Sequence, residues 1–256
     1  MKKYLFRLSL LLSFFGTAFS ISSTENNIEK KTALMNSGVE LSAYKEKIKL
    51  AILKVENTNK ELWSYNISRY ENEEGDISSS IEQYSPHSNQ EWTLKEINGK
   101  APTKKQLKKF AKKNKEQSTK DEKGKEQGGN IQLPIRKLID LGSLSLVSND
   151  DNYLVMEFNV HIKKLGQDSV GKLQGKLRYH KEKAFIEKIT VWNNTEFSPM
   201  FTANITDFII TFTFLQIKDA VLTYQNEMKM KGSFAYFTEI NETSLDTFSD
   251  YIYKGK

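Results

Sequence analysis

The chain has 256 residues, no cysteine, 38 Lys and Arg against 32 Asp and Glu, and a formal net charge of +6. The absence of cysteine excludes a disulfide scaffold, a zinc–thiolate finger, an iron–sulfur cluster and a cysteine nucleophile. With 38% hydrophobic and 11% aromatic residues, the chain has enough apolar material for the core of one large domain or two small ones.

The N-terminus has the three-part pattern of a secretory signal peptide. Lys2, Lys3 and Arg7 form a basic head, residues 8–15 are apolar, and small residues follow up to Ser20. The apolar run is too short to cross a bilayer, which takes about 20 residues. We therefore predict that residues 1–20 are a signal peptide cleaved near Ser20 and that the mature protein is periplasmic, with an uncleaved anchor as the alternative.

The next segments predict a lead-in and a helix. Residues 21–37 are polar and aperiodic, which predicts a flexible lead-in. Apolar residues then recur at spacings of three and four, which is typical of an amphipathic helix. They are Leu41, Tyr44, Ile48, Ile52 and Val55. Such a helix packs on a core or, alternatively, moves as a lid.

After Asn57 the apolar period changes from 3.6 to 2, which indicates strands. Trp63 and Tyr65 alternate with polar residues, and the strand ends in a turn near residues 71–75. A second strand over residues 79–84 can return antiparallel to the first. These strands predict a hairpin with an aromatic face.

A third strand, centred on Trp92, ends at Asn98-Gly99, a dipeptide that accepts positive φ readily. A helix after Thr103 would carry Leu107 and Phe110 on one side. Residues from about 111 to 130 are polar and of low complexity, so we predict a lysine-rich flexible insertion. It interrupts a single domain over residues 38–256.

From residue 131 to the C-terminus the chain is a succession of short alternating segments joined by turn residues. The order contains no βαβ alternation, so the strands predict an antiparallel meander. A sheet of this length curls rather than staying flat. The predicted fold class is therefore α+β, mainly β: a curled antiparallel sheet forming a half-barrel, with one or two helices packed on its concave face.

Methionine and phenylalanine dominate the apolar faces of the predicted strands. Such soft, adaptable side chains suit a cavity for an acyl chain, and they suit a plain core equally, so both interpretations stay open. The candidate ligand-binding residues are Met156, Phe158, Phe208, Ile210, Phe212, Phe214, Tyr224 and Met228.

Residues 100–125 contain eleven lysines, three acids and no arginine. This run is either a solvated loop or a surface attracted to anionic lipid headgroups. The lack of arginine and of stacking aromatics argues against nucleic acid as a partner. The candidate membrane-surface residues are Lys104, Lys105, Lys108, Lys109, Lys112 and Lys113. Without this run and the basic head, the remaining residues carry a net charge of −5.

No catalytic or metal-binding pattern is present, so we expect no enzymatic activity, no metal and no cofactor. His87, His161 and His180 have no ligand spacing, and residues 149–152 predict a turn rather than a calcium loop. A hydrolase of envelope polymers is the remote alternative. It would need Glu157, Glu187 and Asp207 to converge around one pocket.

Several segments resemble exported proteins of marine proteobacteria. The resemblance is carried by residues 92–103, 175–177, 186–189, 193, 197–199, 228–232 and 248–251. In architecture the chain also resembles the periplasmic lipoprotein-carrier superfamily, the LolA-like and LppX-like half-barrels, which bind acyl chains and do no chemistry. The resemblance implies a monomeric, non-enzymatic periplasmic protein that binds a lipid, a lipoprotein acyl chain or an envelope partner. A structural or protein-interaction module of the envelope is the alternative.

Overall fold

A computed structural model describes residues 23–121, 135–235 and 238–255. The chain divides into two compact units, Met1–Glu40 and Leu41–Lys256. Within the first unit, the described residues form the N-terminal part of helix α1 (Ser23–Glu56). The predicted signal peptide and residues 122–130 of the predicted insertion lie outside the described residues.

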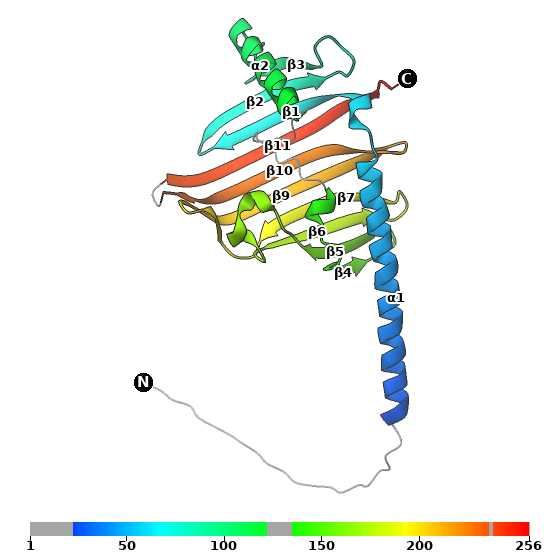
Figure 1. The fold of residues 1–256 in the computed structure, drawn as a ribbon. Helices are drawn as coiled ribbons and strands as arrows, with labels where there is room; N and C mark the ends of the chain where they lie inside the picture. Colours follow the sequence, from blue (N-terminus) through cyan, green and yellow to red (C-terminus); the bar gives the residue numbers. More distant parts are fainter. Residues whose placement is uncertain (1–22, 122–134, 236–237, 256) are drawn as a thin grey trace, which may run out of the picture. The chain divides into compact units, whose positions relative to one another are not determined.

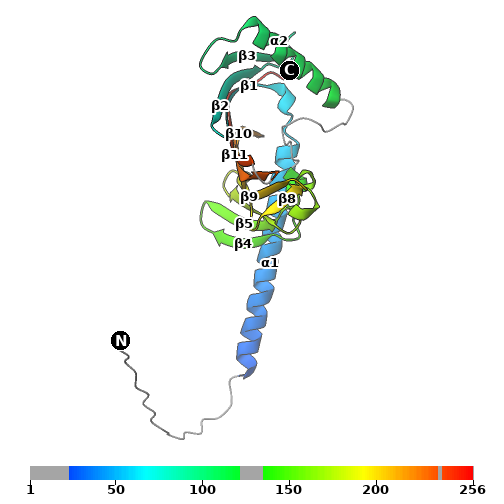
Figure 2. The same ribbon diagram turned by 90° about the vertical axis from the view of Figure 1, so that its left-hand side faces the viewer.

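The second unit is built on one antiparallel sheet, in which the described residues form eleven strands. The order is β3-β2-β1-β11-β10-β9-β7-β6-β5-β4, and β8 pairs with β9. The strands are β1 (Trp63–Glu73), β2 (Asp76–Tyr84), β3 (Trp92–Ile97), β4 (Ser145–Asn149), β5 (Tyr153–Asn159), β6 (Leu173–His180), β7 (Phe185–Asn193), β8 (Phe197–Met200), β9 (Ala203–Ile217), β10 (Ala220–Phe234) and β11 (Thr238–Tyr253). Since β3 and β4 are unpaired edges, the sheet is not closed, and Figure 2 shows that it curls. The predicted fold class is confirmed.

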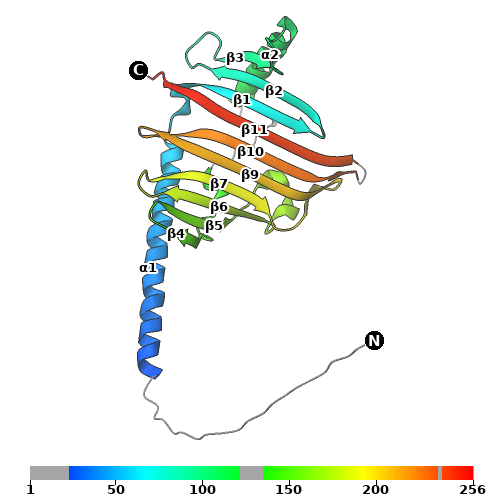
Figure 3. The ribbon, with the colours of Figure 1, turned by 180° about the vertical axis from the view of Figure 1, so that it is seen from behind.

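The sequence-distant pairing of β1 with β11 joins the N-terminal hairpin to the C-terminal strands. It makes β1 the neighbour of both β2 and β11 in the middle of one half of the sheet (Figures 1 and 3). The predicted turns are confirmed, because Glu74 and Gly75 separate β1 from β2 and both Asn98 and Gly99 have positive φ. Positive φ costs glycine little, and asparagine tolerates it.

Helix α1 lies against the sheet through residues 41–56. Its inward side chains Tyr44, Ile48, Ile52 and Val55 are buried in one cluster with residues of β5, β6, β7 and β9, and Leu41 packs at the margin of this cluster. The predicted helical period is therefore confirmed. The helix begins at Ser23, so it includes residues 23–37, for which the sequence predicts a lead-in. Helix-favouring residues in that stretch, such as Glu25, Ala33 and Leu34, explain this start.

The remaining helices of the described residues are short or peripheral. They are α2 (Lys104–Asp121), α3 (Ile135–Leu138) and the 3₁₀ turns η1 (Lys60–Leu62), η2 (Lys163–Leu165) and η3 (Gln167–Ser169). Helix α2 contacts β3 and lies on the same side of the sheet as α1 (Figures 1 and 3). Among the described helices, none combines the length and the apolar character that a membrane span requires.

Candidate functional site

One row of directly paired residues crosses the concave face and changes character halfway. From β5 through β7 to β9 the row is apolar, and from β10 through β11 to β1 and β2 it is polar. In order it runs Met156, Leu177, Ile189, Phe212, Asn226, Asp246, Arg69 and Ser80. The change divides the concave face into a covered half (β4–β9 and the start of β10), which α1 closes, and an open half (β1, β2, β3, β11 and the rest of β10).

The covered half is a filled core. Met156, Phe158, Phe208, Ile210 and Phe214 are all buried, and they belong to the same cluster as the inward side chains of α1. Phe212 and Met228 are partly buried at its margin. Most of the candidate ligand-binding residues therefore lie under α1, against other side chains. Tyr224 lies apart, 45% exposed, as the extra residue of a β-bulge in β10.

An ion-pair network occupies the centre of the open half. Arg69 on β1 lies between two carboxylates, and its Nε is 3.1 Å from Glu82 Oε2 on β2. Its Nη1 donates a hydrogen bond to Asp246 Oδ2 on β11. The three side chains are only 20%, 14% and 22% exposed, respectively. Partial burial raises the pKa of the Asp246 carboxyl, and Glu82 and Glu71 add to that rise against the opposing effect of Arg69.

Seven aromatic rings form a continuous panel, the aromatic panel, toward the end of the sheet where β1 begins and β11 ends. Its members are Trp63, Tyr65, Tyr84, Trp92, Phe248, Tyr251 and Tyr253, with centroid distances of 5.0–6.3 Å between neighbouring rings. Tyr65 is its hub, because it contacts rings on β2, β3 and β11. Burial, with smaller contributions from neighbours, raises the pKa of Tyr65 to about 12. Burial also raises the pKa of Tyr251, whose hydroxyl donates to Thr223 O at 2.6 Å.

Residues 57–62, the strap, connect α1 to β1 and are fixed at both ends. Thr58 Oγ1 donates to Lys54 O at 2.9 Å and accepts from Val221 N at 3.1 Å. At the other end Lys254 N donates to Leu62 O at 2.7 Å. Between these anchors Asn59 Oδ1 accepts from Glu61 N and caps the 3₁₀ turn η1. The strap therefore has a defined path, held to β10 and to the end of β11.

Two cavities lie against the strap. The larger, of about 860 Å³, is lined by Lys54, Asn57, Thr58, Asn59, Leu62, Trp63, Ile217, Lys218, Asp219, Ala220, Tyr251, Ile252 and Tyr253. Its walls are mainly apolar and include three rings of the aromatic panel, while Lys54, Lys218 and Asp219 supply its charges. A ligand in this cavity would therefore meet apolar side chains and cations together.

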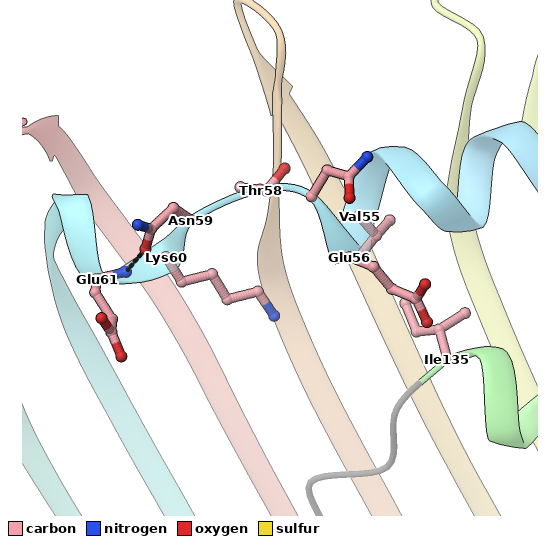
Figure 4. A pocket seen from close by; sticks show the side chains of 8 residues that line it. Val55, Glu56, Thr58, Asn59, Lys60, Glu61 and Ile135 are labelled. Atoms are coloured by element: carbon pink, nitrogen blue, oxygen red, sulfur yellow. Dashed lines mark hydrogen bonds between the residues drawn. The ribbon is translucent and has the colours of Figure 1, made fainter.

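The smaller cavity, of about 570 Å³, is more polar (Figure 4). It is lined by Val55, Glu56, Asn57, Thr58, Asn59, Lys60, Glu61 and Ile135. Arg136 forms an ion pair with Glu56 at 2.8 Å, which occupies that carboxylate. Lys60 retains solvent-accessible surface but is surrounded by protein atoms, and this desolvation lowers the pKa of its ammonium group.

The candidate membrane-surface lysines lie on a different part of the unit. All six, at positions 104, 105, 108, 109, 112 and 113, are exposed on α2. None of them lines either cavity.

The carboxylates that a hydrolase would need do not converge. Neither cavity is lined by Glu157, Glu187 or Asp207. Glu157 pairs with Lys176 at 3.0 Å and Glu187 pairs with Arg178 at 2.8 Å. Among the described residues, no group of histidines and carboxylates has the arrangement to hold a metal ion.

The histidines lie outside both cavities. His87 and His161 are exposed, and the ring of His180 contacts those of Tyr153 and Phe185. The segment predicted as a turn rather than a calcium loop is confirmed as a turn, because Asp150 Oδ1 accepts from the backbone nitrogens of Asn152 and Tyr153.

Local sequence patterns do not predict the Arg69 network, the strap or the larger cavity as functional features. The alternation of Trp63 and Tyr65 does predict an aromatic face, which is one side of the panel. The other side comes from Phe248, Tyr251 and Tyr253 on β11. Predicting this β11 side of the panel requires knowing how β1 pairs with β11, and nothing local in either segment specifies that pairing.

No protein-family model matches the chain, and no curated protein sequence matches it. Among solved structures, the chain is similar to a DUF1329 family protein from Desulfovibrio piger, with 7% sequence identity and a TM-score of 0.31. The alignment covers 83% of this chain and 92% of that chain. A likeness at this level carries no argument about function, and the resemblance to lipoprotein carriers stays a prediction from the sequence.

Proposed function

We propose that this chain is a periplasmic binding protein for an amphiphilic lipid, held without chemical change in the larger cavity beside the strap. The observation that carries the proposal is the asymmetry of the concave face. Helix α1 fills one half, whereas a largely apolar cavity beside the strap, lined by α1, the β9–β10 turn, the start of β1 and the end of β11, continues into the aromatic panel of the open half. A concave, mostly apolar site with a few placed polar groups is typical of small-molecule binding.

The size and lining of the cavity favour an acyl chain. A volume of about 860 Å³ lies within the usual range for ligand sites, which is about 300–1,000 Å³. Burying each methylene group contributes about 0.8 kcal/mol. About ten methylenes would therefore contribute about 8 kcal/mol, from which the costs of association must be subtracted.

The charges at the cavity favour an anionic headgroup. Lys54 and Lys218 both line it, against the single carboxylate of Asp219. Lys54 Nζ also donates to Lys183 O at 3.3 Å, which leaves ammonium protons for a ligand. Lys218 forms no ion pair with a described residue. A carboxylate or phosphate group could accept hydrogen bonds from both lysines while its chain lies on Leu62, Trp63 and Ile252.

The polar groups of the open half favour binding over catalysis. The Arg69 guanidinium is already paired with Glu82 and Asp246. Burial raises the pKa values of Tyr65 and Tyr251 further above the ordinary value for tyrosine, so both are protonated at neutral pH and are poor general bases. The Tyr251 hydroxyl already donates its hydrogen bond to Thr223 O.

The test is displacement of a fluorescent fatty acid from the purified mature chain, together with native mass spectrometry of protein prepared from the periplasm. Ile252→Glu places a charge in the cavity at a side chain that is 55% exposed, so folding should be retained. We expect this variant to weaken probe binding at least about tenfold, or about 1.4 kcal/mol, since the bound acyl chain would desolvate the new carboxylate and the carboxylate would repel the anionic headgroup.

Ile77→Glu is the matched control, because Ile77 is 57% exposed in β2 and does not line the cavity. It should bind the probe as the unmodified chain does. The proposal fails if the unmodified chain does not bind the probe and carries no lipid in its native mass spectrum. Equal loss of binding in both variants also counts against it.

Export is tested separately. Cell fractionation and N-terminal sequencing should find the chain in the periplasm, beginning just after Ser20. A chain that retains Met1 in the cytoplasm would overturn the proposed compartment without affecting the binding result.

A further inference from the structure

Helix α2 presents one face to the sheet and the other to solvent. Gln106, Phe110 and Asn114 are half-buried at spacings of four, and the helix contacts β3. The outward half of the helix carries the lysine stripe. It consists of Lys104, Lys105, Lys108, Lys109, Lys112 and Lys113, all exposed. Because period-3.6 spacing places these six together, they form a row of cations on one surface.

The start of α2 is fixed by reciprocal hydrogen bonds. Thr103 Oγ1 accepts from Gln106 N at 3.3 Å, and Gln106 Oε1 accepts from Thr103 N at 2.7 Å. This capping box holds the first turn of the helix, so Lys104 and Lys105 begin an ordered array rather than a loose chain end.

The lysines of the stripe do not stabilise helix α2, so helix stability does not account for their presence. The first turn contains no acidic residue, although the positive end of the helix dipole disfavours cations there. Residues 104–114 contain no Asp or Glu. Lys104, Lys105, Lys108, Lys109 and Lys113 form no salt bridge with a described residue. These five lysines therefore concentrate positive charge against helix preference and without an ion pair to a described residue.

We propose that the lysine stripe of α2 docks this unit on the surface of an anionic phospholipid bilayer. Ammonium groups are compact point charges that suit a fluid layer of lipid headgroups. Nucleic acids, in contrast, are usually bound by bidentate hydrogen bonds from arginine to phosphates and by aromatic rings that stack on bases. The stripe has neither, because it contains no arginine and Phe110 faces the sheet side. Apart from these cations, Leu107 is 39% exposed on α2, and one such side chain is a weak apolar anchor, so docking is peripheral and dominated by electrostatics.

The proposal is independent of ligand binding in the larger cavity, since the lysine stripe and the cavity lining share no residue. The test is co-sedimentation of the mature chain with vesicles of phosphatidylglycerol and phosphatidylcholine in equal parts, and with vesicles of phosphatidylcholine alone. The test variant is K104Q/K105Q/K108Q/K109Q. The control variant is K137Q/K183Q/K188Q/K231Q, which removes the same charge from exposed lysines outside the stripe.

The control variant should retain binding to the mixed vesicles, whereas the test variant should bind on the order of 600-fold more weakly, since each of its four replaced lysines contributes about fivefold near such a surface. Raising the salt concentration should weaken binding through screening, and neutral vesicles should not bind. Equal loss in both variants would indicate net charge rather than the stripe and would overturn the proposal. Tight binding to a soluble polyanion with no binding to the mixed vesicles would also overturn it.

Discussion

Arg69 on β1 lies directly opposite Asp246 on β11, and the Arg69 guanidinium donates a hydrogen bond to the Asp246 carboxylate. This pair lies in the row of the concave face that is apolar under α1 and becomes polar at Asn226. The fold therefore uses one face of one sheet for two purposes: an apolar core on one side, and partly buried aromatic and charged groups on the other.

Replacing Arg69 with methionine should destabilise the fold. The substitution leaves two partly buried carboxylates without their cation, which costs about 2–4 kcal/mol of unfolding free energy. Arg178→Met is the matched control, because Arg178 is paired with Glu187 on an exposed surface and is 44% exposed. It should cost about 1 kcal/mol or less. Urea denaturation of the two variants measures both values, and equal costs would contradict the central role of Arg69.

The raised pKa of Asp246 predicts the sign of a pH effect. Because the folded protein holds this proton more tightly than the unfolded chain does, the group contributes stability fully below its ordinary pKa of 3.8. That contribution is lost as pH rises through the folded-state value. The unfolding free energy of the unmodified chain should therefore increase relative to that of Asp246→Asn as pH falls from neutral toward 4. A difference that shrinks over this range would show that attraction to Arg69 outweighs burial.

Helix α1 should behave as part of the core. Ile48 is fully buried among sheet residues, so Ile48→Ala should cost about 2–5 kcal/mol. Leu50, on the same helix, is 62% exposed, and Leu50→Ala should change stability by no more than about 0.5 kcal/mol. Thermal or urea unfolding distinguishes the two variants. If Ile48→Ala lowered the unfolding free energy no more than Leu50→Ala does, α1 residues 41–56 would act as a movable lid.

Replacing Gly175 with alanine tests whether the covered half of the concave face is filled with side chains. A Cβ added to Gly175 on β6 would lie 2.4 Å from ring atoms of Phe158 and 2.9 Å from Val160 Cγ2. In a packed core this overlap should cost about 1–3 kcal/mol. Gly38→Ala is the control, because open space surrounds that helical position, and it should be neutral or stabilising by up to about 1 kcal/mol. A neutral Gly175→Ala would mean that Phe158 has an empty space to move into.

Local sequence patterns predict the helices, strands and turns well, whereas the residues of the candidate site are brought together by strand pairing between distant segments. The helical period from Leu41 to Val55 and the turn at Asn98-Gly99 depend on neighbouring residues, so both could be predicted. Tyr224 could not be placed, because a bulge between Thr223 and Gln225 changes the alternation of β10 without a local signal. The pairing of Arg69 with Asp246 joins residues far apart in the sequence. A single sequence holds no record of that contact, so the polar half of the concave face emerged only from the fold.

The proposed lipid lies in the larger cavity beside the strap, against the rings of Trp63, Tyr251 and Tyr253. The chain has three tryptophans, and their positions allow a direct test. Trp63 lines the larger cavity, whereas Trp192 pairs with Ile209 on the opposite face, and Lys176 Nζ lies 5.8 Å from its ring centroid. The measurement is quenching of tryptophan fluorescence by a brominated fatty acid, which acts only at short range.

Two variants separate the signals: Trp92→Phe/Trp192→Phe retains Trp63, and Trp63→Phe/Trp92→Phe retains Trp192. Binding in the cavity predicts strong, saturable quenching of Trp63 and little quenching of Trp192. Equal quenching of both tryptophans, or quenching of Trp192 alone, would contradict it.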